Sequence, residues 1–367
     1  MYYIMNKDRI IMSFEFVKNG LGIYEPVVAE GKLPNMFSRI SLKQWLEMRR
    51  SAKHRTEIRK LLKSLGMLSL KGFIDVTYGL TLTDTFWIRP AESKLYWNEV
   101  SLYKNKFNDI IANSAFLGSI PDFRLKTTSP EYGTDGMLPK CWVRREDDIY
   151  LLKGGIKGFW DSSNEPYSEY FASQLANSLK LNHVHYNIEL YHSSTVSSCR
   201  LVTSEKVSMF PSVFLFAECS DISNYMKIVD NTGFSERFRE MLVFDALIFN
   251  YDRHLGNMQF LYDADTLDII DIAPIFDNGA GLASRYRTDK FDNIYSYCQS
   301  KVPFAYDSFD DMLGFLMSDR LYNKLRNVMD FEFISDENIS YNPKRLDSLN
   351  RLIRIRIAEI IRLADSY

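Results

Sequence analysis

The stretches FNYDRHLGNMQF, at residues 249–260, and IIDIAPIFDNGAG, at residues 269–281, decide how this chain is interpreted. In the first stretch, Asp252 and Asn257 are five residues apart, and in the second, Asp277 follows an apolar run. A short apolar run of this kind predicts a strand, so the Asp277 carboxylate is expected at a strand end. The two stretches therefore predict a loop and a strand end that together carry three oxygen-bearing side chains.

These three side chains suit phosphoryl transfer. That reaction needs cradled phosphates, a bound metal ion and an aligned acceptor hydroxyl, and little covalent help from the protein. Magnesium prefers oxygen ligands, so Asp277 is the candidate principal metal ligand and Asn257 the secondary one. Asp252 is the candidate base that accepts the proton of the incoming hydroxyl. Arg253 and His254 could hold the loop through hydrogen bonds.

Each short motif also has a plainer interpretation. NYDRH fits a surface turn with an ion pair between Asp252 and Arg253, because short motifs often occur by chance. FDNG fits an ordinary Asn-Gly turn. The combination favours the catalytic interpretation, because Asp277 follows twenty residues after Asn257 and lies at the predicted strand end.

Lys153 is the next candidate, since it ends the apolar run IYLL. A strand would hold its ammonium group rigidly at the rim of a cleft, within reach of a nucleotide's phosphates. Such a lysine needs an acidic partner, and Glu169 on the following predicted helix, EPYSEYFASQLANSLKL, is the first choice, with Glu165 second. The alternative is an exposed strand-end lysine, because lysine is usually exposed.

The segment TDGMLPK is the candidate phosphate loop. Gly136 could let backbone N–H groups face an anion, and Lys140 could add positive charge. A plain loop fits these residues equally well.

Composition limits the classes of function. The 367 residues are 46% hydrophobic and carry a formal net charge of −2, so nothing in the charge balance calls for nucleic acid or an anionic membrane as partner. No apolar run approaches the roughly 18 residues that a membrane span needs. The four cysteines form no CxxC pattern, which argues against a zinc site or a disulfide framework and favours the cytoplasm.

Residues 1–120 are expected to form a separate accessory region. Within them, residues 41–65 predict a basic helix that Ser41 caps and Gly66 ends. Its charged side chains, which include Arg49 and Arg50, favour a solvated face. The alternative is a docking surface for an acidic peptide or nucleic acid. Residues 64–90 predict short strands and turns.

Downstream, the pattern changes from strands to helices. CWVRR and DIYLLK predict a hairpin, and the helix at 165–181 shows an apolar face. HVHYNIELYHS and PSVFLFAEC predict further strands, and FSERFREMLVFDALIFN predicts a long helix. A closing helix carries its apolar face at Leu346, Leu349, Ile353, Ile357, Ile360 and Ala364.

With these motifs assembled, the chain resembles the HipA-like serine/threonine kinases. The resemblance rests on the ordered series SPE, TDGMLPKCW, LLKGG, EPYSEYFAS, DRHLGN and IAPIFDNG, and it extends from about residue 127 to the C-terminus. It implies an α+β, two-lobed protein-kinase-like fold, with a small mixed α/β N-lobe at residues 121–217 and a mainly helical C-lobe at 218–367. ATP and magnesium would bind in the cleft between the lobes.

The resemblance also implies roles for individual residues. Lys153 would be the lysine that contacts the ATP phosphates, Asp252 the catalytic base, and Asn257 and Asp277 the metal ligands. Adenine would lie near Phe216, Ala217 and Glu218. The family's phosphate loop carries a serine that can be autophosphorylated. The aligned position in this chain is Gly133, so Thr134, Ser129, Thr128 or Thr127 could replace it, or this control is absent.

The expected function is therefore an ATP- and Mg²⁺-dependent kinase that phosphorylates a protein Ser or Thr hydroxyl. A toxin-like or regulatory role with an antitoxin-like partner is implied by the resemblance, with nucleic acid contacted only indirectly and no membrane partner. Two alternatives remain open at this point: a small-molecule phosphotransferase, and a non-catalytic regulator that uses the basic helix.

Overall fold

The computed structural model of this protein describes residues 1–50, 62–63, 67–117, 128–134, 136, 138–156, 164–216, 222–286 and 291–365. Contacts between Cα atoms divide the chain into two compact units. The first comprises Met1–Leu152, Leu201–Phe210 and Phe260–Ile270, and the second Lys153–Arg200, Pro211–Gln259 and Asp271–Tyr367. The expected three-part division at residues 120 and 217 stays a prediction.

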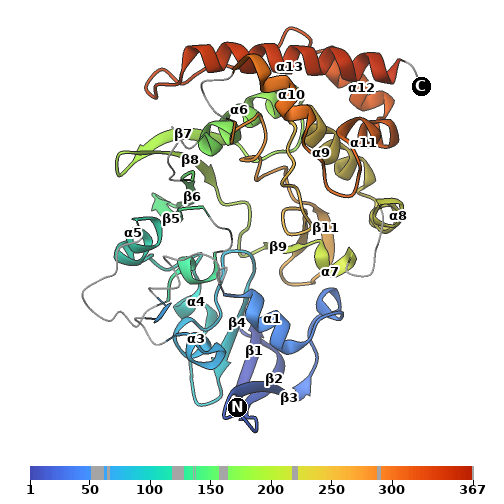
Figure 1. Cartoon of the computed structure of the whole chain (residues 1–367). Coiled ribbons are helices and arrows are strands. Elements are labelled where there is room, and N and C mark those ends of the chain that lie inside the picture. Colours follow the sequence, from blue (N-terminus) through green and yellow to red (C-terminus); the bar gives the residue numbers. More distant parts are fainter. Residues whose placement is uncertain are drawn as a thin grey trace. The chain divides into compact units, whose positions relative to one another are not determined.

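The first unit begins with an antiparallel four-stranded sheet in the order β3-β2-β1-β4 (Figure 1). Tyr2 pairs with Phe14 across β1 and β2, and their rings stack with centroids 5.4 Å apart. The strands are β1 (Tyr2–Asn6), β2 (Arg9–Lys18), β3 (Tyr24–Gly31) and β4 (Phe86–Pro90).

Helix α1 (Leu42–Met48) confirms the predicted helix start. The Ser41 hydroxyl accepts a hydrogen bond from the Gln44 N–H at 3.2 Å, and the Gln44 side chain accepts one from the Ser41 N–H at 2.8 Å. This capping box satisfies two backbone donors at the helix start. The predicted continuation at residues 51–61 and the predicted end at Gly66 lie outside the described residues.

The expectation of strands and turns for residues 64–90 is wrong for α3 (Leu70–Thr77). The Ser69 hydroxyl caps this helix by accepting from the Gly72 N–H at 3.0 Å. Burial of its apolar face outweighs the β-branched residues that favoured a strand. The buried residues of α3 are Leu70, Phe73, Ile74 and Thr77.

Arg49 is a buried residue and does not belong to an exposed basic surface. Because α1 ends at Met48, Arg49 leaves the helical face and reaches inward. Its Nη1 and Nη2 donate to both oxygens of Asp84 at 2.9 and 2.8 Å, and Nη2 also donates to the Phe86 carbonyl at 2.7 Å. The side chain is 5% exposed, so the expectation that it faces solvent or a docking partner is corrected.

The rest of the first unit confirms the predicted hairpin. Strands β5 (Lys140–Arg145) and β6 (Asp148–Lys153) are neighbours in a sheet, and Glu146 takes a positive φ of 53° in the turn between them. The remaining elements of this part of the chain are η1 (Asn35–Phe37), α4 (Trp97–Val100), α5 (Asp109–Leu117) and η2 (Pro130–Gly133).

Three short strands form a further sheet in the order β11-β10-β9. They are β9 (Val207–Pro211), β10 (Gln259–Asp263) and β11 (Ile269–Ile272). The predicted strand at PSVFLFAEC is wrong, because β9 ends at Pro211 and Val213–Phe216 forms the short helix α7.

The second unit carries the predicted helix α6 (Glu165–Ser178), followed by the antiparallel pair β7 (Tyr186–Tyr191) and β8 (Ser194–Arg200). Tyr167, Phe171 and Leu175 are buried on one face of α6, as expected. The other helices of this unit are α8 (Ile222–Thr232), α9 (Ser235–Ile248), η3 (Phe291–Asn293), α10 (Ile294–Gln299), α11 (Phe309–Leu316), α12 (Asp319–Arg326) and α13 (Pro343–Ala364).

The closing helix α13 packs against α9, α11 and α12 (Figure 1). Four residues of its predicted apolar face are buried: Leu349, Ile353, Ile357 and Ile360. Among the helices that the structure describes, none combines the length and the apolar character that crossing a bilayer requires.

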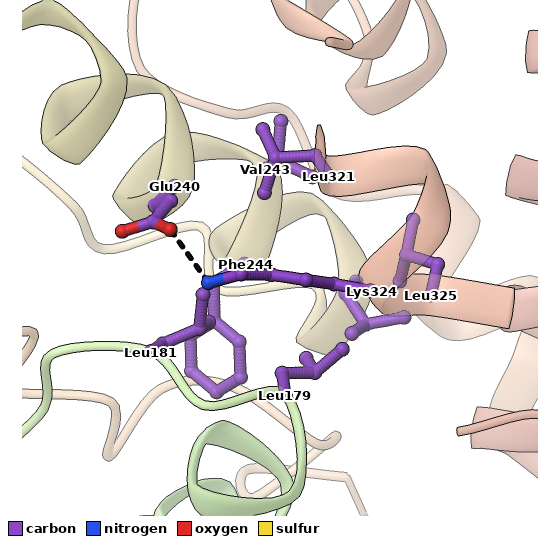
Figure 2. A pocket seen from close by; sticks show the side chains of 9 residues that line it. Leu179, Leu181, Glu240, Val243, Phe244, Leu321, Lys324 and Leu325 are labelled. Carbon is purple, nitrogen blue, oxygen red and sulfur yellow. Dashed lines mark hydrogen bonds and ion pairs between the residues drawn. The ribbon is translucent and has the colours of Figure 1, made fainter. Parts of the chain in front are cut away.

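A small cavity lies between α9 and α12 (Figure 2). The Glu240 carboxylate is 2% exposed, and Lys324 pairs with it at 2.6 Å across the cavity. Arg320 and Arg237 approach the same carboxylate at 3.4 and 3.6 Å. The cavity measures about 10 Å³, room for about one water molecule and far too little for a nucleotide. We therefore interpret this feature as part of the helix packing.

The Arg49 contacts generate a stability prediction. Arg49→Met leaves the Asp84 carboxylate buried without its partner, so we expect the free energy of unfolding to fall by about 3–5 kcal/mol in urea titrations. The control is Arg9→Met, since Arg9 is exposed on β2 and its loss should change stability by less than about 0.5 kcal/mol. Equal midpoints for the two variants would contradict the structural role.

Candidate active site

Lys153 and Glu169 form a buried ion pair within the second unit. Strand β6 ends at Lys153, and α6 carries Glu169. Lys153 Nζ donates to Glu169 Oε1 at 2.5 Å, and the two side chains are 8% and 1% exposed. The predicted pairing is thus confirmed, whereas Glu165, the second choice, lies 3.7 Å from Arg285 Nε.

Asp277 is the second carboxylate at Lys153. Its Oδ1 accepts from Lys153 Nζ at 2.5 Å, and its side chain is 37% exposed. Its φ is 59°, in the left-handed region that residues other than glycine rarely occupy. Such backbone strain is concentrated at functional sites, where surrounding contacts hold it. The Tyr186 hydroxyl lies 3.5 Å from the Asp277 N–H.

The electrostatics keep Lys153 charged. Burial by itself would lower the pKa of Lys153, but the nearby carboxylates of Asp277 and Glu169 raise it well above its ordinary value. Burial raises the pKa of Glu169, against the opposing pull of Lys153. We hold the Glu169 carboxylate to be ionised at neutral pH, because it accepts hydrogen bonds from both Lys153 and the Asn278 N–H, the latter at 2.8 Å.

The loop that follows α9 carries Asp252 and Asn257. The side chain of Asp252 is 53% exposed. The Asn257 amide donates to the Asp252 carbonyl at 3.4 Å, and the Gly256 N–H donates to His254 Nδ1 at 3.0 Å. The loop is therefore a tight turn closed by its own side chains, with His254 in the holding role that the sequence predicts.

Arg253 connects this loop to the segment around Asp277. Its Nη1 donates to the carbonyls of Asn257 at 3.1 Å and Phe276 at 2.6 Å, and its Nη2 donates to Asn278 Oδ1 at 2.9 Å. Its Nε and Nη2 also donate to the two Asp245 oxygens at 2.8 and 3.0 Å. One buried guanidinium group thus fixes the candidate base and the candidate metal ligands relative to each other.

Several residues of the site were missing from the sequence prediction. Asp245 is the anchor of Arg253, and Asn250 donates to its Oδ1 at 2.8 Å. Burial raises the Asp245 pKa, and the attraction of Arg253 opposes that rise. An acid inside the apolar run MLVFDALIF was the available signal, because an acid is rarely buried unless it is paired. Asn278 and Tyr186 had no comparable signal.

Magnesium fits the donor set of Asp277 and Asn257. Both offer oxygen atoms, and magnesium sites of this kind are completed by phosphate oxygens and water. Within the described residues, no group of three or more His, Cys, Asp or Glu side chains could hold a metal ion by itself.

The candidate phosphate loop is described at Gly136 and Lys140, in the first unit. Gly136 has a φ of 94°, and a Cβ on it would meet Lys140 Nζ, the end of a flexible side chain. The positive φ favours glycine at this position, whereas the Lys140 side chain is flexible and could move away from a Cβ. The structure thus places the two predicted residues side by side, while their role toward a phosphate stays a prediction.

The candidate modification sites differ in their surroundings. A Cβ on Gly133 would meet the Thr81 methyl group at 2.8 Å, so a serine cannot be accommodated there without a shift. Thr134 Oγ1 donates to the Pro130 carbonyl at 2.7 Å, and Ser129 is buried. Thr127 lies outside the described residues.

The predicted adenine contacts are only partly described. Phe216 ends α7 and is 1% exposed, with its ring 4.8 Å from that of Tyr225. Ala217 and Glu218 lie outside the described residues. The adenine position therefore stays a prediction.

Arg253 generates a stability prediction. Arg253→Lys keeps the charge but cannot reach all the oxygens that the guanidinium binds, so buried acceptors lose their donors. We expect the free energy of unfolding to fall by at least about 2 kcal/mol in urea titrations. The control is Arg351→Lys on α13, where the arginine is 71% exposed. Equal stability of the two variants would show that the network does not hold the loops.

Cys199 provides a pH-dependent prediction. Burial raises the pKa of its thiol from 9.0 to about 12. Above about pH 9, the unfolded chain therefore binds fewer protons than the folded protein, and the stability that this group contributes falls as the pH rises. We expect the stability difference between wild type and Cys199→Ala to change, against the wild type, by about 1.4 kcal/mol per pH unit between about pH 9 and 11. A difference that is constant across this range in urea titrations would refute the burial effect.

Comparisons with known proteins were made for the whole chain. No family model matches it. The serine/threonine-protein kinase CtkA of Helicobacter pylori is 29% identical over 259 residues, which cover 64% of this chain and 74% of CtkA. The crystal structure of a Helicobacter pylori proinflammatory kinase CtkA aligns with 62% of this chain and 93% of its own, at 19% identity and a TM-score of 0.49.

A second solved structure shares the fold across the full length. HipA of Shewanella oneidensis, in a toxin–antitoxin complex with HipB and operator DNA, aligns with 100% of this chain and 99% of its own. Its TM-score is 0.58 at 11% identity, a likeness that concerns the mixed α/β fold alone. The chain is thus similar in sequence to the serine/threonine-protein kinase CtkA and shares its mixed α/β fold with HipA.

Proposed function

We propose that this protein is an ATP- and Mg²⁺-dependent protein kinase that phosphorylates Ser or Thr hydroxyls. The observation that carries the proposal is the buried Lys153–Glu169 pair at 2.5 Å, which meets the Asp277 carboxylate in the same site. A buried lysine between two carboxylates is a costly arrangement for structure alone, because each desolvated charge needs compensation. An incoming phosphate would give Lys153 a further anionic partner.

The proposed roles follow from position and chemistry. Lys153 would bind the ATP phosphates, with Glu169 fixing its ammonium group. Asp277 and Asn257 would hold magnesium, which when bound offsets the negative charge of the phosphates. In the transfer itself, the acceptor oxygen bonds to the γ-phosphorus as the bond to the β-phosphate oxygen breaks, and ADP leaves. Asp252 takes the hydroxyl proton on its half-exposed carboxylate.

Two further parts of the proposal concern the nucleotide. Gly136 and Lys140 would contact its phosphates, in keeping with a glycine at a positive φ beside a lysine. Adenine would lie near Phe216, Ala217 and Glu218, the segment that the family resemblance indicates. Both assignments would be tested by ATP affinity in single variants.

The biological setting is proposed from the relatives. HipA occurs in a complex with HipB and operator DNA. By analogy, we propose a regulatory or toxin-like kinase in the cytoplasm, restrained by an antitoxin-like partner. Nucleic acid would be contacted only through that partner, because the charge balance of the chain is slightly acidic. Co-purification with a protein encoded beside it would support this setting.

The decisive experiment compares wild type and Asp252→Ala with labelled ATP and magnesium, with and without a cell lysate. We expect labelled serine or threonine from the wild type and at least about a hundredfold less from the variant, because a positioned base contributes about that factor or more. Mapping by mass spectrometry would also show whether Thr127, Thr128, Ser129 or Thr134 is modified.

The matched control is Asp347→Ala, since Asp347 is 70% exposed on α13. It should retain the activity of the wild type. Wild-type protein that binds ATP with magnesium but labels neither itself nor any lysate protein would exclude the proposed kinase. Label on a small molecule alone would instead indicate a small-molecule phosphotransferase.

A further inference from the structure

Arg285 lies beside the candidate base without being tightly bound. Its Nη2 is 3.6 Å from Asp252 Oδ2, and its Nε is 3.7 Å from Glu165 Oε1. Both distances exceed that of a direct hydrogen bond. The Arg285 side chain is 38% exposed, whereas that of Glu165 is 5% exposed. The guanidinium group therefore keeps donors that it can offer to a ligand next to Asp252.

A second cationic side chain, Lys301, lies over the ring of Tyr251, which Arg285 also approaches. Lys301 Nζ lies 5.1 Å from the centre of the Tyr251 ring and 4.2 Å from that of Tyr297, and the Arg285 guanidinium lies 5.8 Å from the Tyr251 ring. Within the described part of the chain, no carboxylate forms an ion pair with Lys301. Tyr251 directly precedes Asp252 in the sequence, so Lys301 contacts the residue next to the candidate base, and Arg285 lies near both.

Arg285 is not needed to hold its own backbone segment. That task falls to Arg345 on α13, which is 1% exposed. Its Nη2 donates to the Ala283 carbonyl at 2.6 Å and its Nη1 to the Tyr286 carbonyl at 3.0 Å, one on each side of Arg285. The backbone is thus fixed by a buried residue, and the half-exposed guanidinium group is left to face whatever approaches Asp252.

The position of these cations restricts the acceptor. A hydroxyl that gives its proton to Asp252 must come within hydrogen-bond distance of it, so residues next to the acceptor pass close to Arg285 and Lys301. We propose that these two side chains select acceptor segments with Asp or Glu beside the Ser or Thr. This inference rests on the proposed kinase function. Guanidinium groups bind carboxylates in a bidentate manner, and basic neighbours would be repelled.

The test uses two synthetic peptides that differ only at the residues flanking one serine, which are Glu in one and Ala in the other. With wild-type protein, we expect kcat/KM to be about tenfold higher for the Glu peptide, the effect of about one charge-assisted hydrogen bond. In Arg285→Gln and Lys301→Met, the advantage should shrink mainly through a higher KM for the Glu peptide. The control Arg351→Gln should keep the full preference.

Peptide binding without ATP, measured by fluorescence anisotropy, separates the two hypotheses. If the protein binds the Glu peptide preferentially and Arg285→Gln abolishes this preference, the acidic acceptor is supported even without phosphate transfer. The absence of phosphate transfer would then contradict the kinase proposal only. Phosphate transfer with equal kcat/KM for both peptides would overturn the acidic acceptor and leave the kinase standing. An equal fall in kcat/KM for both peptides in Arg285→Gln would mean that Arg285 only positions Asp252. That result would also overturn the proposal of an acidic acceptor.

Discussion

The buried guanidinium group of Arg253 is the constraint on which the candidate site depends. It binds the Asp245 carboxylate, the carbonyls of Asn257 and Phe276, and the Asn278 amide oxygen. A charge buried in this way must keep its partners, because an unpaired buried ion costs several kcal/mol. Neither loop can therefore move alone without leaving Arg253 or its acceptors unpaired. The relative position of the candidate base and the candidate metal ligands is thus set by the contacts of Arg253, which has no proposed role in the reaction.

The two carboxylates that contact Lys153 differ in how deeply they are buried. Glu169 is 1% exposed and also accepts from the Asn278 N–H, so it is fixed from two sides. Asp277 is 37% exposed and sits on a left-handed backbone, at the open side of the pair. The same ammonium group thus has one permanent partner and one that faces solvent. In the proposed kinase, this difference lets a metal and a phosphate compete for Asp277 and Lys153 without disturbing Glu169.

The sequence predicted those parts of the fold in which local pattern and tertiary burial agree. The apolar stripe of α6, the β5–β6 hairpin and the closing helix α13 are such cases. The pattern failed at α3 and α7, where β-branched and aromatic residues indicated strands but a serine cap or a short turn after Pro211 decided the outcome. For the site, the Lys153–Glu169 pair was predictable from element order. The burial of Arg49 was not, because it depends on Asp84, which is distant in sequence. Asp245 was missed, although an acid inside an apolar run was a signal for it.

Substrate choice is expected to lie outside the motifs, for a reason of stability. Lys153, Glu169 and Arg253 are buried and held by ion pairs and hydrogen bonds. Substitutions at these positions would therefore lower stability as well as the proposed activity. Arg285 and Lys301 are partly exposed, and buried residues hold the backbone next to Arg285, so their side chains can vary at little cost in stability. A family that keeps one reaction while changing its acceptor would change such positions first. We therefore expect the acceptor specificity of this chain to depend mainly on Arg285 and Lys301.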